Sequence, residues 1–241
     1  MPIIARNLLV AVAMLASAAP SFAQEVLVTG QRRSQGDYNN GYAGGMVAAQ
    51  RSVISLRRQA DYAVQPVRLI GDTRDATVRM NDLNATLRNM IAGAGKAGVE
   101  LAIGDYVVQP LTLANYRNLN YGGDGRPDTS ATTFLVKVKL APGMDIAAAK
   151  AQIKRFIDGV EKVGRSTLVA SGEPTLSVVD PDQYRGRIAD LIAADAVTMK
   201  AKFGPDYGVT VTGLDRPVEW ARAGPTDVFL YLPSSYVVTR K

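Results

Sequence analysis

Three segments of the chain place apolar residues at intervals of three and four positions, which is the spacing of an amphipathic helix. Each segment begins near an Asp or Thr that can cap a helix and stops at a glycine. The segments lie between Asp72 or Thr73 and Gly95, between Asp145 and Gly164, and between Asp180 and Gly204. The third start has the strongest signal, because Asp180 is followed by Pro181 and Gln183. We therefore predict three amphipathic helices.

The segments between these helices are rich in Val, Ile, Leu and Tyr and predict β-strands. The clearest covers residues 132–140, where apolar residues alternate with Lys137 and Lys139, as in a strand with one buried face. Other strands are expected over residues 53–59, 62–71, 99–110, 166–179, 208–221 and 228–238. This mixture predicts an α+β fold, a mainly antiparallel sheet with the three helices packed on one side. The core is then expected to include Leu83, Leu87, Leu191 and Ile192.

Residues 1–23 have the parts of a secretory signal peptide. Arg6 supplies the basic start, residues 8–19 are apolar, and Ser21 and Ala23 are small residues at positions −3 and −1 of a cleavage site. The apolar run is shorter than the roughly 18–20 residues that cross a bilayer as a helix, although an uncleaved anchor is the alternative. We expect export to the periplasm or outer envelope, with a mature chain that begins at Gln24.

Residues 24–50 are interpreted as a flexible tether before a single α+β domain over residues 51–241. The tether opens with a short β-prone run, residues 25–33. Residues 34–45 are rich in Gly, Asn and Tyr and have too few apolar side chains to form a core. Residues 24–45 are expected to be disordered in the free protein, because an isolated strand buries too little apolar surface to offset its ordering.

Two absences from the composition narrow the possible chemistry. The chain has no Cys, so no disulfide can stabilise it, and it has no His. His is the usual partner of a Ser nucleophile and the commonest ligand of transition metals. Triad hydrolases, Cys-nucleophile enzymes and zinc sites are therefore excluded, apart from rare carboxylate-only variants. Carboxylate pairs, Ser–Lys dyads and Ca²⁺ sites stay open, but we expect no cofactor and assign no catalytic or metal-binding residue.

Basic and aromatic residues each allow two interpretations. The net charge is +6, and the expected export argues against a nucleic-acid partner. A basic surface would then contact anionic lipid or polysaccharide at the membrane periphery, or would face solvent without a partner. The basic residues concerned are Arg51, Arg57, Arg58 and Arg68. The aromatic residues that either pack in the core or line a glycan groove are Tyr106, Tyr116, Tyr121 and Trp220.

Three motifs resemble ligand or catalytic sites, and each has a simpler interpretation. Asp180 and Asp182, with Glu173 nearby, could form a carboxylate pair, but their positions suit the start of a helix. Residues 121–128 contain Asp and Gly residues, as calcium-binding loops do. They lack the alternating ligands and the closing Glu of an EF-hand loop, so an exposed loop or turn is the simpler interpretation. Residues 93–98 contain glycines and a lysine, but they lie at a helix end, where a phosphate loop needs a helix start.

The order of elements and three motifs resemble the SIMPL family of exported bacterial proteins. Residues 60–64, Ala-Asp-Tyr-Ala-Val, are similar to the family's opening Pro-Asp-x-Ala-x-Val strand, with Ala60 in place of Pro. Residues 96–99, Lys-Ala-Gly-Val, are similar to its exit from the first helix, with Pro110 downstream. Residues 193–201 carry its Ala-rich helical pattern before Gly204. The resemblance implies an envelope protein without accepted enzymatic activity that often self-associates, and it supplies no active-site residues.

The start of the expected mature chain resembles the N-terminal segment of TonB-dependent receptors. Such a segment pairs by strand addition with the sheet edge of a partner, whereas the alternative is an exposed tail. The residues expected to bind a TonB-like envelope partner are Glu25, Val26, Leu27, Val28, Thr29, Gly30, Arg32 and Arg33.

The sequence thus predicts a non-enzymatic, periplasmic SIMPL-like protein that acts through protein–protein contact or self-assembly, in envelope stress or maintenance. One alternative is a TonB-linked accessory protein recruited through residues 25–33. The other is a carboxylate-dependent enzyme acting on glycans, in which Glu173 and Asp182 would be essential.

Overall fold

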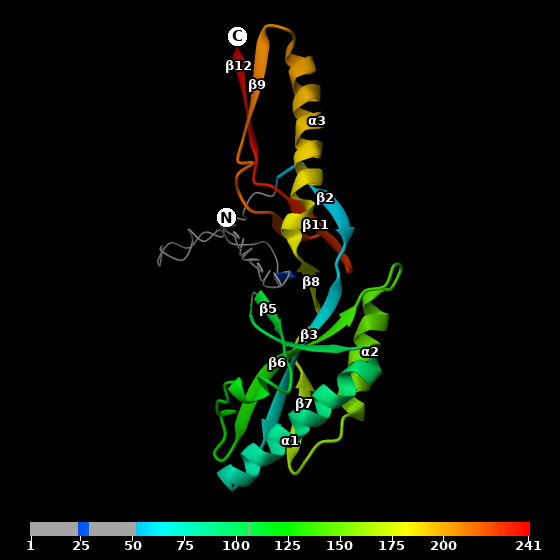
Figure 1. The fold of residues 1–241 in the computed structure, drawn as a ribbon, viewed down its shortest axis with the longest axis vertical. Coiled ribbons are helices and arrows are strands. Elements are labelled where there is room, and N and C mark those ends of the chain that lie inside the picture. The colour runs from blue at the N-terminus through cyan, green and yellow to red at the C-terminus, as the bar shows by residue number, and fades with distance from the viewer. Residues whose placement is uncertain (1–23, 29–51, 106) are drawn as a thin grey trace, which may run out of the picture.

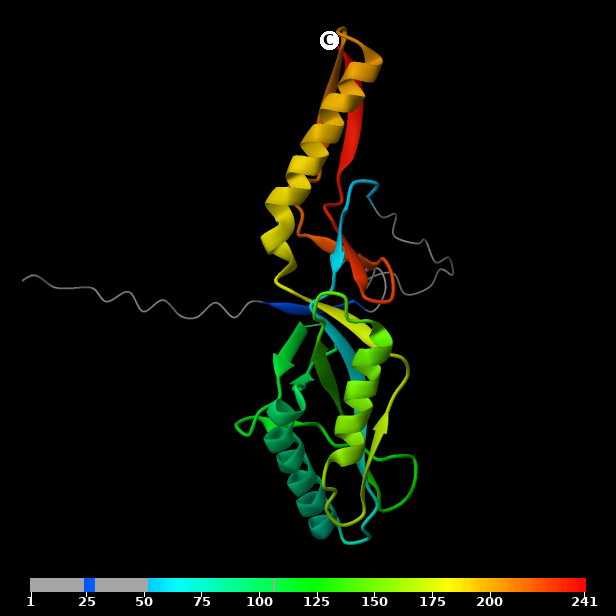
Figure 2. The same ribbon diagram turned by 90° about the vertical axis from the view of Figure 1, so that its right-hand side faces the viewer.

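The computed structural model describes residues 24–28, 52–105 and 107–241. The predicted signal peptide, residues 1–23, lies outside the described residues, as do residues 29–51 and Tyr106. The described chain is elongated and has two parts (Figures 1 and 2). One is a ring of strands that carries α1 and α2, and the other is built on α3.

The structure contains both helices and strands, and every strand pairing is antiparallel. The helices are α1 (Ala76–Ala94), α2 (Ile146–Gly159) and α3 (Arg185–Phe203), with short 3₁₀ helices η2 (Gly95–Ala97), η3 (Tyr116–Asn118) and η4 (Pro181–Tyr184). The strands are β1 (Glu25–Val28), β2 (Leu56–Gln59), β3 (Tyr62–Gly71), β4 (Glu100–Ile103), β5 (Val107–Pro110), β6 (Ser130–Lys139), β7 (Ser166–Ala170), β8 (Thr175–Val179), β9 (Tyr207–Thr212), β10 (Glu219–Arg222), β11 (Asp227–Tyr231) and β12 (Ser235–Arg240). The predicted α+β class is confirmed.

Two of the three predicted helix starts are wrong in detail. The α1 helix is capped by Asp75, whose Oδ1 accepts a hydrogen bond of 2.9 Å from the Val78 amide, and not by Asp72 or Thr73. Asp145 caps α2 as predicted and accepts from the Ala148 amide at 2.6 Å. Asp180 has a left-handed backbone with φ of 45° and makes no side-chain cap. The chain there forms η4 first, so α3 begins at Arg185.

Six strands close into a ring. The seven-stranded sheet has the order β6-β4-β5-β1-β8-β3-β7, and β3 also pairs with β6 along its whole length, from Tyr62 opposite Lys139 to Gly71 opposite Ser130. This pairing joins the first strand of the order, β6, to the sixth, β3. Strand β7 pairs with β3 over residues 67–71, next to the part of β3, residues 62–64, that pairs with β8. Each ring strand therefore presents one face to the interior of the ring and one to the exterior.

Each face of the ring has its own apolar cluster. Five ring strands contribute one side chain each to a small cluster: Leu27, Val64, Ala102, Val108 and Leu135. These positions share the inward face, since Val64 pairs with Lys137 and Ala102 pairs with Leu135. The larger cluster lies on the outer face, where α1 and α2 supply Leu83, Leu87 and Ile153. Lys137 was expected on a solvent-exposed face, but that face is the ring interior and the residue is 4% exposed.

The tether predicted for residues 24–50 is wrong at its start. Strand β1 pairs along its whole length with β8 and at Glu25 and Val26 with β5, and all four of its residues are buried. The physical reason is that β1 fills the space between β5 and β8 and buries a side chain on both faces of the ring. Residues 29–50, the rest of the predicted tether, lie outside the described residues.

The α3 helix does not join α1 and α2 on one side of a sheet, so that part of the prediction is wrong. It packs against the two-stranded β9–β12 sheet and against β11 of the small β10-β11-β2 sheet, beyond one end of the ring (Figures 1 and 2). Ile192 is buried as expected, whereas Leu191 is 42% exposed. The helix therefore has its own narrow contact face and leaves much of its surface open.

Candidate functional sites

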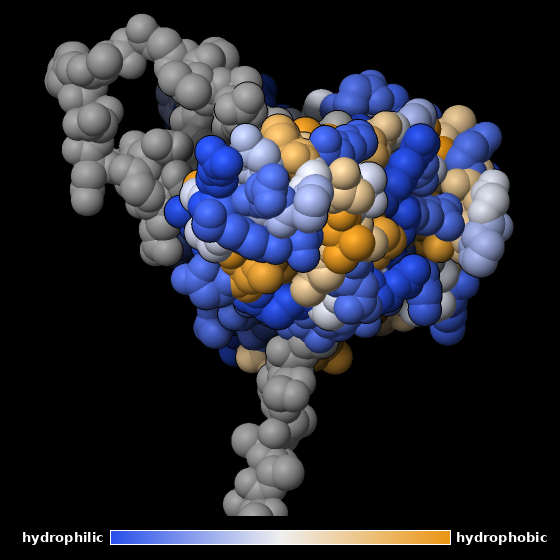
Figure 3. Space-filling view, turned by 90° about the horizontal axis from the view of Figure 1, so that it is seen from above, coloured by the Kyte–Doolittle hydropathy of each residue, from blue (hydrophilic) through white to orange (hydrophobic). Residues whose placement is uncertain are grey.

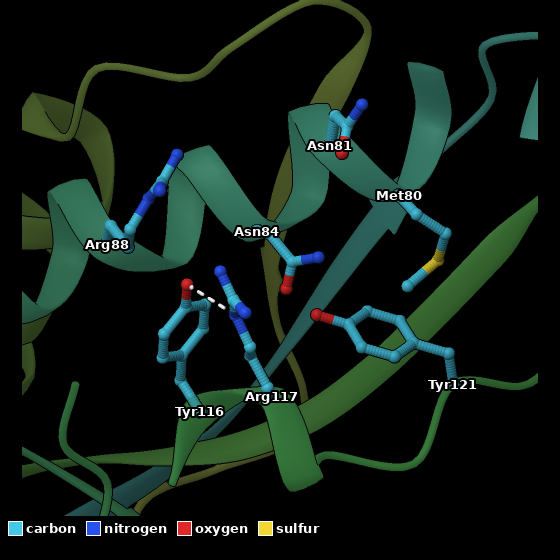
Figure 4. A pocket seen from close by; sticks show the side chains of 7 residues that line it. All are labelled: Met80, Asn81, Asn84, Arg88, Tyr116, Arg117 and Tyr121. Atoms are coloured by element: carbon cyan, nitrogen blue, oxygen red, sulfur yellow. Dashed lines mark hydrogen bonds between the residues drawn. The ribbon is translucent and has the colours of Figure 1, made fainter. Parts of the chain in front are cut away.

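A cavity of about 470 Å³ lies between α1 and the loop that joins β5 to β6 (Figure 4). Its lining residues are Met80, Asn81, Asn84, Arg88, Tyr116, Arg117 and Tyr121. The first four share a face of α1 because they are spaced by one, three and four residues. This volume is within the range of small-molecule sites.

Local hydrogen bonds hold the loop side of the cavity in place. Asn115 accepts from the Thr112 amide at 2.7 Å and donates to the Pro110 carbonyl at 2.9 Å, which fixes the start of η3. A backbone bridge between Gly122 and Ala131 ties the following segment to β6. Tyr116 and Tyr121 are thereby fixed opposite α1 before any ligand binds.

The cavity is positively charged on one side. The Arg117 Nε donates a hydrogen bond of 3.1 Å to the Tyr116 hydroxyl. This bond, with the charges of Arg117 and Arg88, holds the pKa of Tyr116 below its usual value. None of the seven lining residues is acidic, and neither arginine forms an ion pair within the described chain. The site is therefore suited to an anion.

Two buried polar atoms in the cavity have no hydrogen-bond partner among the described residues: Asn84 Oδ1 and the Tyr121 hydroxyl oxygen. The two groups face one another across the cavity (Figure 4). Burial raises the pKa of Tyr121 to about 12. An unpaired buried polar group lowers the stability of a protein by about 1–3 kcal/mol. These two unpaired atoms therefore destabilise the free protein.

A second candidate site is the part of the molecule farthest from the ring, which we call the arm: residues 193–203 of α3 with β9 and β12. Within the described chain, no residue of 193–212 or 235–240 is buried. Strands β9 and β12 pair with each other and, in the described residues, with no other strand. Seen from the arm's end, apolar surface is interspersed with hydrophilic surface (Figure 3). The arm or its base exposes these apolar side chains: Leu191, Val197, Phe203, Tyr207 and Val237.

The first four residues of the predicted partner-binding segment form a buried strand of the ring. Glu25, Val26, Leu27 and Val28 form β1, which pairs along its whole length with β8 and at Glu25 and Val26 with β5. The Leu27 carbonyl accepts a hydrogen bond from Trp220. Strand addition needs a free edge, so the folded protein does not offer these four residues to a TonB-like partner. Thr29, Gly30, Arg32 and Arg33 lie outside the described residues.

The carboxylates considered for glycan hydrolysis have other partners. Glu173 forms an exposed ion pair of 2.9 Å with Lys150, and Asp182 accepts a hydrogen bond of 2.9 Å from the Val218 amide. In the loop of residues 121–128, Asp124 is ion-paired with Arg68 at 2.7 Å. The described ranges contain no group of three or more acidic side chains placed to hold a metal ion.

The other motifs have structural roles. Gly98 ends η2 with a left-handed φ of 65°, so residues 93–98 form the end of a helix, as predicted. Trp220 is buried and donates from Nε1 to the Leu27 carbonyl at 3.1 Å. Arg57 and Arg58 pair with Asp227 and Asp61. Arg51 and Tyr106 lie outside the described residues. The spacing of Asn81, Asn84 and Arg88 was available in the sequence, but the helix pattern alone did not identify these residues as cavity lining.

Among the described helices, none has the length and apolar character needed to cross a membrane.

Comparison with known proteins gives little. No family model matches the chain, and no curated protein matches it. One solved structure is similar, the crystal structure of an uncharacterized conserved protein from Listeria innocua. It is 12% identical, and the alignment covers 75% of this chain and 92% of that chain with a TM-score of 0.15. A likeness at that score carries no argument about fold or function.

Proposed function

We propose that this chain is an exported, non-enzymatic envelope protein that acts by self-association through the arm. The observation that carries the proposal is the lack of any buried side chain in residues 193–212 and 235–240 of the described chain. The sequence resemblance to the SIMPL family supports the same conclusion, as does the predicted signal peptide. The separate engagement of Glu173 and Asp182 argues against the glycan-acting alternative.

The arm lacks the burial that stabilises most folded segments. Ordering the backbone costs roughly 1–2 kcal/mol per residue, and a two-stranded ribbon alone is marginally stable in water. Within the described residues, the ribbon packs against α3, and the buried residues of that helix, Ile188 and Ile192, come before residue 193. A partner that covers the exposed apolar side chains of the arm would supply the missing burial.

A second copy of this chain fits the open face of α3. Leu191, Ala194, Val197 and Ala201 are exposed and spaced by three, three and four residues, so they share one face of the helix. Asp190 is exposed near the start of this face, and Lys200 and Lys202 are exposed near its end. Two copies packed antiparallel would bring each Asp190 near the partner's Lys200 and Lys202. Asp190 and the two lysines are thus complementary across a two-fold interface, whereas Arg187, exposed four residues before Leu191 on the same face, takes no part in this pairing.

The oligomeric state of the purified exported protein tests this proposal. We expect light scattering after size-exclusion chromatography to give a dimer or larger assembly. Val197→Glu, which places a charge at the centre of the face, should yield a monomer. The matched control is Val78→Glu on an exposed position of α1 (47% exposed), which should leave the assembly intact. A monomeric wild type at micromolar concentration, or a Val197→Glu variant that still assembles, would overturn the proposal.

Charge reversal tests the antiparallel arrangement itself. Asp190→Lys should weaken assembly by placing like charges together, and so should the double change Lys200→Asp with Lys202→Asp. Combining all three changes should restore assembly, because the complementarity is then inverted and preserved. Failure of the combined variant to recover, with each variant folded by circular dichroism, would rule out this pairing.

A further inference from the structure

The cavity between α1 and η3 contains polar groups that the rest of the fold does not satisfy. Asn84 Oδ1 can only accept a hydrogen bond, whereas the Tyr121 hydroxyl can donate or accept. Because the two groups face each other (Figure 4), one ligand hydroxyl could donate to Asn84 and accept from Tyr121. A hydroxyl-bearing ligand would therefore satisfy both buried atoms at once.

The charge of the cavity selects for an anion. Arg88 and Arg117 supply two guanidinium groups, and the lining has no carboxylate to neutralise them. Arg117 uses its Nε to hold Tyr116, and a guanidinium has further N–H donors that match the two oxygens of a carboxylate. The positive side of the cavity is thus suited to a carboxylate.

The remaining lining is apolar and aromatic. The rings of Tyr116 and Tyr121 provide flat surfaces of the kind that contact the C–H faces of sugar rings, and Met80 adds a flexible apolar side chain. The volume of about 470 Å³ is within the range of small-molecule sites.

We propose that this cavity is a binding site for an acidic sugar, with Arg88 and Arg117 contacting the carboxylate and Asn84 and Tyr121 sharing a hydroxyl. The site is on the ring, away from the arm, so it is independent of the proposed self-association.

Calorimetric titration of the purified exported protein with glucuronate tests the proposal. We expect saturable binding of glucuronate, with glucose and acetate each binding at least about tenfold more weakly, because each lacks one of the two recognised groups. Inorganic phosphate should also bind more weakly. Absence of glucuronate binding at millimolar concentration, or equal binding of glucose or phosphate, would overturn the proposal.

Variants separate a binding role from a structural one. Tyr121→Phe and Asn84→Leu each remove an unpaired buried polar atom, so we expect the melting temperature of the free protein to be unchanged or raised. Glucuronate binding should nevertheless fall about tenfold or more. Arg117→Ala should also lose binding, whereas Arg155→Ala, an exposed arginine on α2 outside the cavity, should not. Unchanged binding in Tyr121→Phe and Asn84→Leu would refute the assigned roles.

Discussion

Glu25 and Lys137 form an ion pair across the interior of the strand ring. Their strands, β1 and β6, stand opposite each other in the closed order, so the pair joins two sides that share no backbone hydrogen bonds. Ser177 donates to Glu25 at 2.5 Å, and Lys137 also approaches Glu100 at 3.4 Å. Glu25 lies just after the predicted cleavage site, so the start of the predicted mature chain contributes a charge to the interior of the fold.

Breaking this pair should destabilise the protein strongly. Glu25→Gln leaves the Lys137 ammonium, whose side chain is 5% exposed, without its close carboxylate. Losing one partner of a buried ion pair typically costs about 3–5 kcal/mol, and urea unfolding should show a decrease of this order. The matched control is Glu173→Gln, which breaks an exposed pair with Lys150 and should cost no more than about 1 kcal/mol. Equal effects of the two variants would contradict a buried role for Glu25.

Leucines on two helices should respond very differently to truncation. Leu87 on α1 is fully buried against the ring, whereas Leu191 on α3 is 42% exposed. Leu87→Ala should lower the free energy of unfolding by about 2–5 kcal/mol. Leu191→Ala should change the stability of the monomer by no more than about 0.5 kcal/mol. Denaturant unfolding at low protein concentration measures both, and a large loss for Leu191 would mean that α3 packs elsewhere.

The single tryptophan reports whether β1 is in place. Trp220 is 3% exposed and donates to the Leu27 carbonyl. Deleting residues 24–28 should expose the indole, shift its fluorescence emission to longer wavelength and lower the stability. In the intact protein, hydrogen exchange should be slow at Val26 and Val28, because both are buried and pair with β8, and Val26 also pairs with β5. Rapid exchange there would support the flexible tail predicted from the sequence.

Alkaline pH should destabilise the fold through three tyrosines. Burial raises the pKa of Tyr62, Tyr121 and Tyr236 to about 12 each, with Glu100 adding to the effect at Tyr62 and Asp195 at Tyr236. In the unfolded chain the same groups ionise near pH 10. Between these values the native state binds more protons, so its extra stability is present below pH 10 and is lost as the pH rises towards 12.

Ultraviolet absorbance can follow these ionisations directly. The folded protein should show a late group of tyrosines near pH 12, and the protein in denaturant should show none. Tyr121→Phe should remove one member of the late group without altering the early part of the titration. A folded protein in which all tyrosines ionise near pH 10 would contradict the burial of these hydroxyls.

The sequence by itself determined most of the local structure. The spacing of apolar residues located three helices, and the alternation over residues 132–140 located β6. Asp145 and Gly98 act at helix ends as their types predicted. These features depend on side chains a few positions apart, so a short stretch of sequence contains the whole cause.

The tertiary structure alone decided which surfaces meet. The alternating pattern of its strand predicts that Lys137 faces solvent. In the structure, the pairing of β3 with β6 closes the ring and places Lys137 in its interior, where it forms an ion pair with Glu25. The four residues of β1 were predicted to form an exposed peptide, but in the structure all four pair with β8 and two of them also pair with β5. The same holds for the cavity, because Asn84 and Tyr121 come from elements 37 positions apart. A side chain's environment depends on distant segments, and periodicity along the chain carries no information about which of those segments will cover it.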